Sequence, residues 1–268
     1  GMIQGQVVFE AEPDRKPIRL LADADATVTG LSYRQQSLGD ATVNVYWGDG
    51  ILDVRSLQLT GGPARVTVTG NADPGQGMSL WVHVTDVRTD RITLVDLEEK
   101  GLDSLDAQLD VHLTGSTDEP LVEQGMLVVR NLVLKERDLG DSVVSISYDG
   151  DVLRLDGTLA DGRLDLQVAS RPEGRMLTRA KVTFEELVVD RELAGEGIPD
   201  GTAALVTGKV EAGMYLKGGF ELEGEAKLTE AALKAGSYLL ESDGDLLLSF
   251  TGDGVQMQGV RLRSSPAR

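Results

Sequence analysis

Few residues of this chain could carry acid–base, nucleophilic or metal chemistry, and their spacing favours none of these. The only two histidines, His83 and His112, each lie between two apolar residues of an alternating segment. This is the pattern of a histidine on the water-facing side of a strand. With no cysteine anywhere in the chain, two isolated histidines favour neither a His-based catalytic triad nor a zinc cage. We therefore predict a non-catalytic protein with no metal site and no cofactor.

Acidic Gly-Asp segments are the next candidates, since carboxylates bind calcium. They occur at Gly48–Gly50, Asp149–Asp151, Asp243–Asp245 and Gly252–Gly254. Calcium-binding β-rolls repeat Gly-Asp about every nine residues, and an EF-hand needs a loop between two helices. Neither spacing occurs, so these segments are predicted to be hairpin turns. No glycine-rich loop opens a helix, and no carboxylate lies in an apolar strand-end context that would suit acid–base catalysis.

Composition narrows the classes of partner. Asp and Glu number 44 against 26 Lys and Arg, giving a net charge of −18, which argues against nucleic acid and anionic membrane surfaces as partners. The 32 glycines suit many turns, and with only four Phe, two Trp and five Tyr the apolar lining must be mostly aliphatic. No apolar run approaches the roughly 18 residues of a membrane-spanning helix.

Period-two alternation of apolar and polar residues dominates the chain. In Leu105–Thr114 every odd position is apolar and every even one is polar, which predicts a strand with one apolar face. Similar segments recur throughout, whereas helical signals are limited to residues 95–100, 185–197 and 229–236. The predicted fold is all-β, a long, curled and mostly antiparallel sheet of repeated hairpins.

A motif recurs at a spacing of 101 residues. Leu38-Gly39-Asp40 is followed by Leu139-Gly140-Asp141, and a weaker copy begins at Leu240-Glu241-Ser242. Fixed-period similarity indicates a protein built by stacking one supersecondary unit. We predict one continuous domain over 1–268 with repeats near 20–100, 101–200 and 201–265. The Gly1-Met2 start, and a pattern still in progress near residue 262, predict a fragment of a larger protein.

An amphipathic sheet cannot leave its apolar face in water at about 25 cal/mol per Å². It must pack on a second sheet as a β-sandwich, or curl into an open groove that receives a ligand. A dispersed aliphatic lining suits fluid acyl chains, although sandwich cores can also be aliphatic. Composition alone leaves both alternatives open.

The stretch from Leu105 to Leu166 resembles the repeat of the AsmA-like superfamily, which includes TamB-type and YhdP-type proteins. Four elements carry the resemblance: the turn Gly115–Pro120, the segment Gly125–Leu127, the corner Leu139-Gly140 and the hairpin segment Asp149–Leu155. The resemblance implies an open, curled sheet with an apolar lining. It also implies a bridge-like lipid transfer protein of the diderm cell envelope, periplasmic and anchored in the inner membrane outside this fragment.

On this resemblance the expected function is to shield phospholipid or other acyl chains during transport between the inner and outer membranes. An alternative is a scaffold or chaperone for outer-membrane protein assembly, in which sheet edges accept a client strand. A third is a plain β-sandwich interaction module. The residues predicted to contact lipid are Leu105, Leu109, Val111, Leu113, Val144, Ile146, Leu153, Leu155, Leu164 and Leu166.

Overall fold

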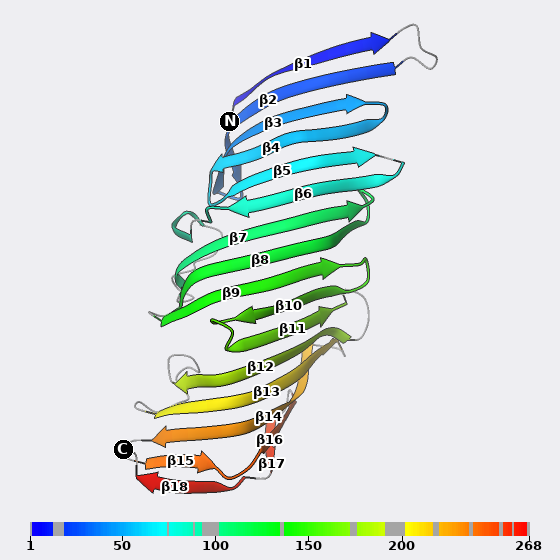
Figure 1. The fold of residues 1–268 in the computed structure, drawn as a ribbon. Helices are drawn as coiled ribbons and strands as arrows, with labels where there is room; N and C mark the ends of the chain where they lie inside the picture. The colour runs from blue at the N-terminus through cyan, green and yellow to red at the C-terminus, as the bar shows by residue number, and fades with distance from the viewer. Residues whose placement is uncertain are drawn as a thin grey trace. The chain divides into compact units, whose positions relative to one another are not determined.

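The alternating segments form strands throughout a computed structural model (Figure 1). It describes residues 2–12, 19–73, 75–87, 89–92, 102–134, 137–171, 176–190, 202–216, 220–235, 238–251, 254–258 and 260–266. These residues divide into two units, residues 1–150 and 151–268, which we call unit 1 and unit 2 and describe separately.

Unit 1 is an antiparallel meander in which each strand pairs with the next along the chain. Alternating side chains and tight Gly- and Asp-containing turns are what such a meander requires. A single 3-10 turn, Thr89–Arg91, follows the sixth strand. The strands are β1 (Met2–Glu12), β2 (Arg19–Tyr33), β3 (Gln36–Gly48), β4 (Ile51–Gly61), β5 (Arg65–Asp73), β6 (Gly77–Thr85), β7 (Leu102–Gly115), β8 (Pro120–Leu134) and β9 (Arg137–Tyr148).

Unit 2 begins as the same kind of meander and then forks. Both β15 and β16 pair with β14, at opposite ends of that strand, while β18 pairs with β15 and β17 with β16. Residues 243–245 separate the two branches. The strands are β10 (Leu153–Leu159), β11 (Leu164–Ser170), β12 (Met176–Asp190), β13 (Thr202–Leu216), β14 (Phe220–Ala235), β15 (Tyr238–Ser242), β16 (Leu246–Thr251), β17 (Gly254–Gln258) and β18 (Leu262–Pro266).

The repeated Leu-Gly-Asp motif marks a β-bulge corner. Gly39 and Gly140 have φ values of 82° and 75°. The residue that pairs with each of them comes directly after a second residue at positive φ, which is Gly30 (67°) for Gly39 and Asn131 (52°) for Gly140. Positive φ suits glycine and is tolerated best by asparagine among the other residues. A Cβ on Gly39 would lie 2.0 Å from the Thr60 carbonyl oxygen, so this corner excludes larger residues.

The third copy of the motif forms a related corner in unit 2. The Gly30 amide donates to Asp40 Oδ1 at 2.9 Å, and the Ala231 amide donates to Ser242 Oγ at 3.0 Å. Asp40 and Ser242 occupy the same position of the 101-residue period. The three corners join β2 to β3, β8 to β9 and β14 to β15, six strands apart in the order of the described strands. Bulges bend a strand and increase its twist, which accounts for the curl of the strands.

Three local predictions are wrong. Residues 229–235 form the end of β14 rather than a helix, because they pair with β13 and, from residue 232, also with β15. Glu185–Asp190 belong to β12, whose residues from Leu187 to Asp190 pair with β13. Residues 95–100 and 191–197 lie outside the described part. Asp243–Asp245 connects β15 to β16, which pair with different parts of β14, and so does not close a hairpin. Asp49 and Gly50, both at positive φ, do form the predicted turn between β3 and β4.

Neither unit has a closed core. Among the described residues only six hydrophobic side chains count as buried, and no side chain is less than 2% exposed. The chain exposes 17558 Å², against about 11,000 Å² for a globular monomer of this size. The predicted all-β, antiparallel and open sheet of hairpins is confirmed, and the sandwich alternative is not what forms. The buried hydrophobic residues are Ala41, Val144, Val152, Phe184, Ala226 and Leu246.

Candidate ligand-binding face

The strand register of unit 1 places apolar residues side by side in rows that run across the strands. Residues paired in an antiparallel ladder point to the same face of a sheet. Each row can therefore be traced from β1 to β9 by following the paired residues alone. We call the face that carries these rows the inner face and the opposite face the outer face.

The central row of the inner face contains no polar side chain on any of the nine strands. It consists of Gly5, Ala26, Val43, Leu57, Val68, Val82, Val111, Gly125 and Ile146. One flanking row consists of Ile3, Val28, Ala41, Leu59, Val66, Val84, Leu109, Leu127 and Val144. The other consists of Val7, Ala24, Val45, Val54, Gly70, Leu80, Leu113, Val122 and Tyr148.

Unit 2 carries an inner face built on the same principle. Its central row consists of Gly157, Leu166, Val182, Val210, Ala226, Leu248 and Met257. One flanking row consists of Leu155, Val168, Ala180, Ala212, Gly224, Phe250 and Val255. The other consists of Leu159, Leu164, Phe184, Gly208, Leu228 and Leu246.

The structure places the predicted lipid contacts on these faces. Nine of the ten residues lie at inner-face positions of the register. Of these nine, Val144 is 8% exposed and the other eight are half-buried. Leu105 is half-buried at a register irregularity of β7. Asp106, Asp110 and His112 lie on the outer face, as the alternation predicts. The nine are Leu109, Val111, Leu113, Val144 and Ile146 in unit 1, and Leu153, Leu155, Leu164 and Leu166 in unit 2.

Sequence reasoning missed most of the inner face. The alternation in β3, β5 and β6 indicates that Val43, Val68 and Val82 each lie on the apolar side of their strand. Only the strand register shows that they belong to the same row as Val111. The small residues of β1 and β2, such as Gly5 and Ala26, give a weak alternation signal.

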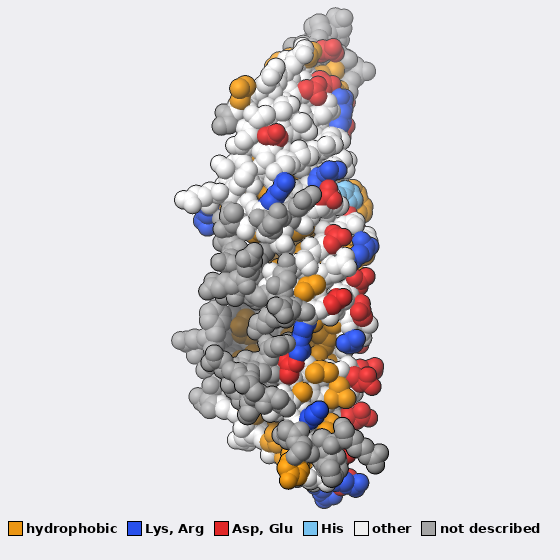
Figure 2. Space-filling view, turned by 90° about the vertical axis from the view of Figure 1, so that its left-hand side faces the viewer, with side chains coloured by type: hydrophobic (Ala, Val, Ile, Leu, Met, Phe, Trp, Pro, Cys, Tyr) orange, Lys and Arg blue, Asp and Glu red, His pale blue; other side chains and the backbone are white. Residues whose placement is uncertain are grey.

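The outer face is polar and internally paired. Arg55 Nη1 lies 3.0 Å from Asp23 Oδ2 in unit 1, and Lys227 Nζ lies 2.6 Å from Asp245 Oδ2 in unit 2. Figure 2 shows acidic and basic side chains lying close to one another on the surface. Such exposed pairs contribute about 0–1 kcal/mol each, so they maintain solubility more than stability.

An aromatic cluster lies within the outer face of unit 1. The Trp81 ring stacks on His112, with 4.3 Å between ring centroids, and also lies 6.4 Å from His83. His112 bonds to Ser79 Oγ at 2.9 Å and pairs with Glu123 at 3.1 Å. Its side chain is only 16% exposed, so the predicted solvated strand histidine is wrong for His112, because Trp81 covers the ring.

His83 is the partner of Asp110 on the same face. The hydrogen bond from His83 holds the pKa of Asp110 below its ordinary value of 3.8, while partial desolvation opposes this shift and Gln108 adds a further hydrogen bond. The pair is a cross-strand contact between β6 and β7. Among the described residues its side-chain hydrogen bonds join only His83, Asp110 and Gln108, so it has the features of a structural contact.

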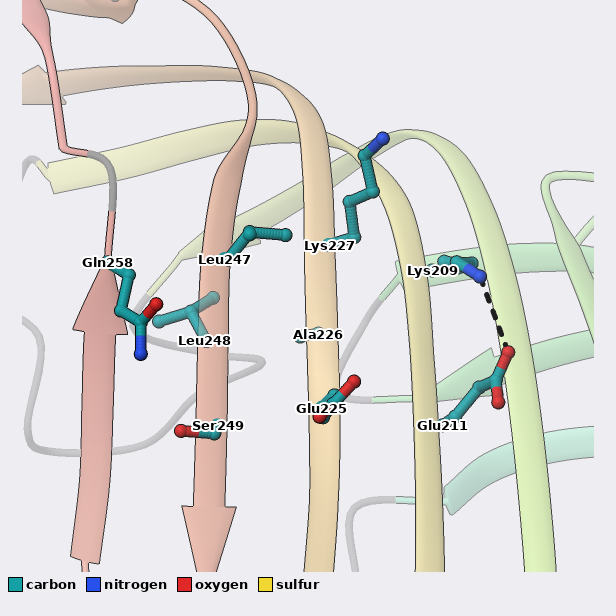
Figure 3. Close-up of a pocket in the computed structure, with 9 residues that line it drawn as sticks. All are labelled: Lys209, Glu211, Glu225, Ala226, Lys227, Leu247, Leu248, Ser249 and Gln258. Carbon is teal, nitrogen blue, oxygen red and sulfur yellow. Dashed lines mark hydrogen bonds and ion pairs between the residues drawn. The ribbon is translucent and has the colours of Figure 1, made fainter.

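Unit 2 contains a hollow of 220 Å³, lined mostly by outer-face residues and also by Ala226 and Leu248 of the inner-face central row (Figure 3). Lys209 Nζ lies 3.4 Å from Glu211 Oε1, and this hydrogen bond lowers the pKa of the exposed Glu211 carboxyl. The lining alternates charged and aliphatic side chains and lies open to water, which suits a solvated surface better than a reaction site. The lining residues are Lys209, Glu211, Glu225, Ala226, Lys227, Leu247, Leu248, Ser249 and Gln258.

Two features are absent from the described residues. No group of three or more His, Cys, Asp or Glu side chains is placed to hold a metal ion. No helix in this part of the chain is long and apolar enough to cross a membrane.

Comparisons with known proteins do not place the chain in a family. No family model, no curated protein and no solved structure matches it. The features that bear on function are therefore the apolar rows of the two inner faces.

Proposed function

We propose that the inner faces of the two units hold the acyl chains of a membrane lipid, and that the protein is a non-catalytic, lipid-carrying segment. The observation that carries this proposal is the central row of unit 1, which crosses nine strands without a polar side chain. With neighbouring strands about 4.8 Å apart, the row extends for about 38 Å. A bilayer core of about 30 Å holds two acyl chains end to end, so the row exceeds the length of one lipid.

The partial exposure of the inner face supports a ligand rather than a core. Val111 and Ile146 are half-buried although their neighbours are apolar. An acyl chain that covers such side chains gains about 0.8 kcal/mol for each buried CH₂ group. Many weak contacts can then hold a lipid without a single anchoring residue.

A continuous lining also suits movement, because a chain that slides exchanges one set of aliphatic contacts for an equivalent set. The resemblance to the AsmA-like repeat supports a location in the periplasm of a diderm bacterium and transport of phospholipid between the inner and outer membranes. On this proposal the protein's partners are lipids and the membranes that exchange them.

The direct test is organic extraction and mass spectrometry of the protein purified without detergent. We expect acyl lipids at a reproducible ratio to protein. A protein that carries no lipid, and takes none from added vesicles, would refute the proposal.

Variants on the two faces make this test specific. Leu109→Asp with Ile146→Asp introduces two carboxylates on the inner face of unit 1, and Met126→Asp with Val143→Asp introduces two on the outer face. The outer pair is an appropriate control because Met126 and Val143 are 42% and 41% exposed. We expect both variants to remain folded, with lipid lost only from the inner-face variant. Unfolding of the inner-face variant alone would instead indicate a packed core, since unpaired buried carboxylates cost several kcal/mol.

A further inference from the structure

The inner face of unit 1 has a fourth row, next to the flanking row of Val45. It lies at the end of the strands where the turns at residues 49–50 and 149–150 lie, which we call the mouth. The opposite end of the strands carries the bulge corners of β2–β3 and β8–β9, and we call it the corner end. The mouth row consists of Phe9, Ala22, Trp47, Leu52, Ala72, Met78, Gly115 and Pro120.

Exposure of the inner face differs between these two ends. We compare β2 to β9, because the described strands pair with only one edge of β1. Across the four rows of these strands, the two buried side chains are Ala41 and Val144, at 6% and 8% exposure, and both lie in the flanking row nearest the corner end. The two exposed side chains are Trp47, at 40%, and Pro120, and both lie in the mouth row. The inner face is therefore covered at one end and open at the other.

The corner end is packed by three segments of unit 1. Gln36 is 3% exposed and donates from Nε2 to the Arg91 carbonyl oxygen at 2.7 Å. Arg91 donates from Nη1 to the carbonyl oxygens of Gly61 and Gly62 at 3.3 and 3.5 Å. A Cβ on Gly62 would lie 2.5 Å from the Leu38 carbonyl oxygen, so the β2–β3 corner and the end of β4 are in direct contact. Protein atoms therefore occupy this end.

Aromatic side chains of the inner-face rows lie toward the mouth. Phe9 and Trp47 belong to the mouth row, and Tyr148 belongs to the row next to it. The Tyr148 hydroxyl donates to the Gly150 carbonyl oxygen at 2.9 Å, so a side chain of the apolar face reaches the turn. Tyr33, on the tip of the β2–β3 hairpin, lies outside the four rows. Trp and Tyr are favoured where one end of the side chain is apolar and the other is wet, so the mouth suits a boundary between acyl chains and water.

The depth of the inner face accommodates one acyl chain. Along β3 the rows run from Ala41 to Trp47, a distance of about 20 Å at about 3.4 Å per residue. One acyl chain spans about 15 Å, half of a bilayer core. A chain lying along the strands therefore fits between the two ends. Its polar group must lie where the face is open to water, since burying a polar group without hydrogen-bond partners costs free energy.

We propose that unit 1 holds a long-chain acyl lipid along its strands, with the end of the acyl chain at the corner end and the headgroup at the mouth, beside Trp47. This inference rests on the proposed function and adds the orientation of the lipid and the depth available to its chain. A lipid held in this way can still move along the rows, because neighbouring strands present the same order of apolar rows. The headgroup stays at the mouth during that movement.

Quenching of tryptophan fluorescence by labelled phosphatidylcholine tests the orientation. One acyl chain carries a nitroxide, either near its carboxyl end or near its terminal methyl group. In the Trp81→Phe variant, which retains Trp47, we expect the nitroxide near the carboxyl end to quench severalfold more strongly. Leu59→Trp, in a protein with both native tryptophans replaced by Phe, should give the opposite order, because Leu59 lies in the flanking row nearest the corner end.

The outcomes separate this inference from the proposed function. Equal quenching of Trp47 by the two probes, or stronger quenching by the nitroxide near the methyl group, would overturn the inference alone. Quenching confined to Leu59→Trp would also overturn it. Absence of quenching in both proteins would remove the proposed function. Trp47 is a native residue, so its result does not depend on whether Leu59→Trp folds.

A matched pair of substitutions on β4 gives an independent test. Leu52 and Leu59 are both half-buried on the inner face, Leu52 in the mouth row and Leu59 near the corner end. A lysine at position 52 can extend its ammonium group into water, so Leu52→Lys should change the amount of bound phosphatidylcholine little. Leu59→Lys places a charge beside the end of the acyl chain and should lower it about tenfold.

Circular dichroism and urea denaturation establish that both lysine variants are folded. If Leu59→Lys unfolds, Leu59→Gln takes its place, because it adds a polar group without a charge. Equal losses of bound lipid in the folded position-52 and position-59 variants, or a greater loss at position 52, would contradict the proposed orientation.

Discussion

The two tryptophans of the chain lie on opposite faces of unit 1 at almost the same exposure, 40% for Trp47 and 39% for Trp81. Trp81 stacks on His112 and lies within a hydrogen-bonded cluster of the outer face. Trp47 lies in an inner-face row between Ala22 and Leu52, and its ring contacts no other aromatic ring of the described residues. Equal exposure therefore has different causes. The outer ring is partly covered by protein partners, whereas the inner ring belongs to a surface that the described sheet leaves open.

The largest expected effect is a difference in fluorescence quenching. The Trp81→Phe variant retains only Trp47, and the Trp47→Phe variant retains only Trp81. Phospholipid brominated on its acyl chains should quench most of the Trp47 emission and little of the Trp81 emission, because only the inner face is expected to contact acyl chains. Equal quenching of both would contradict the assignment of the faces.

A second prediction concerns stability. Trp47→Ala and Trp81→Ala remove similar buried areas, but only Trp81→Ala also removes ring stacking. Such contacts are worth about 0.5–1.5 kcal/mol beyond area burial. Urea denaturation should therefore show Trp81→Ala to be more destabilising by about that amount. A greater loss for Trp47→Ala would mean that the inner face is the better packed one.

The third prediction is a pH dependence carried by Asp110 on the outer face. Its pKa is lowered by the hydrogen bond from His83, so the folded state binds this proton less readily than the unfolded state. The resulting stabilisation is fully present above the unfolded pKa, near 3.8, and is lost as pH falls through the lower folded pKa. Asp110→Asn should reduce the acid-induced loss of stability in denaturation curves between pH 5 and pH 3. An unchanged curve would contradict this role.

The smallest expected effect is at Glu211 in unit 2. Its pKa is also lowered, chiefly by the hydrogen bond from Lys209, but its side chain is 37% exposed and solvent screens the interaction. Glu211→Gln should leave both thermal stability and lipid content unchanged within error. A loss of bound lipid in this variant would give the hollow of unit 2 a function that the inner face does not explain.

The sequence predicted the strand content and, where alternation is clear, which side chains share a face, because alternation is local and is readable from segments such as Leu105–Thr114. It did not predict the rows, because these depend on which residue of one strand meets which residue of the next. The bulges at Gly30 and Asn131 shift that pairing by a residue or more. The helical signal of residues 229–235 was overridden by hydrogen bonding to β13 and β15.

The contact of Trp81 with His112 was also beyond prediction from the sequence. The two residues lie 31 positions apart, and only the pairing of β6 with β7 makes them neighbours.

The spacing of the bulge corners has a consequence for how such a chain could grow. The corners recur after six strands, at β2–β3, β8–β9 and β14–β15. Six is an even number, so a duplicated block starts and finishes at the same end of the strands. Copying the block therefore preserves both the side on which leucines and valines lie and the side at which the turns lie. Tandem duplication of this block would lengthen the sheet by six strands at a time and leave the faces and the strand ends as they are. The length of the sheet could then change without a change in its surface chemistry.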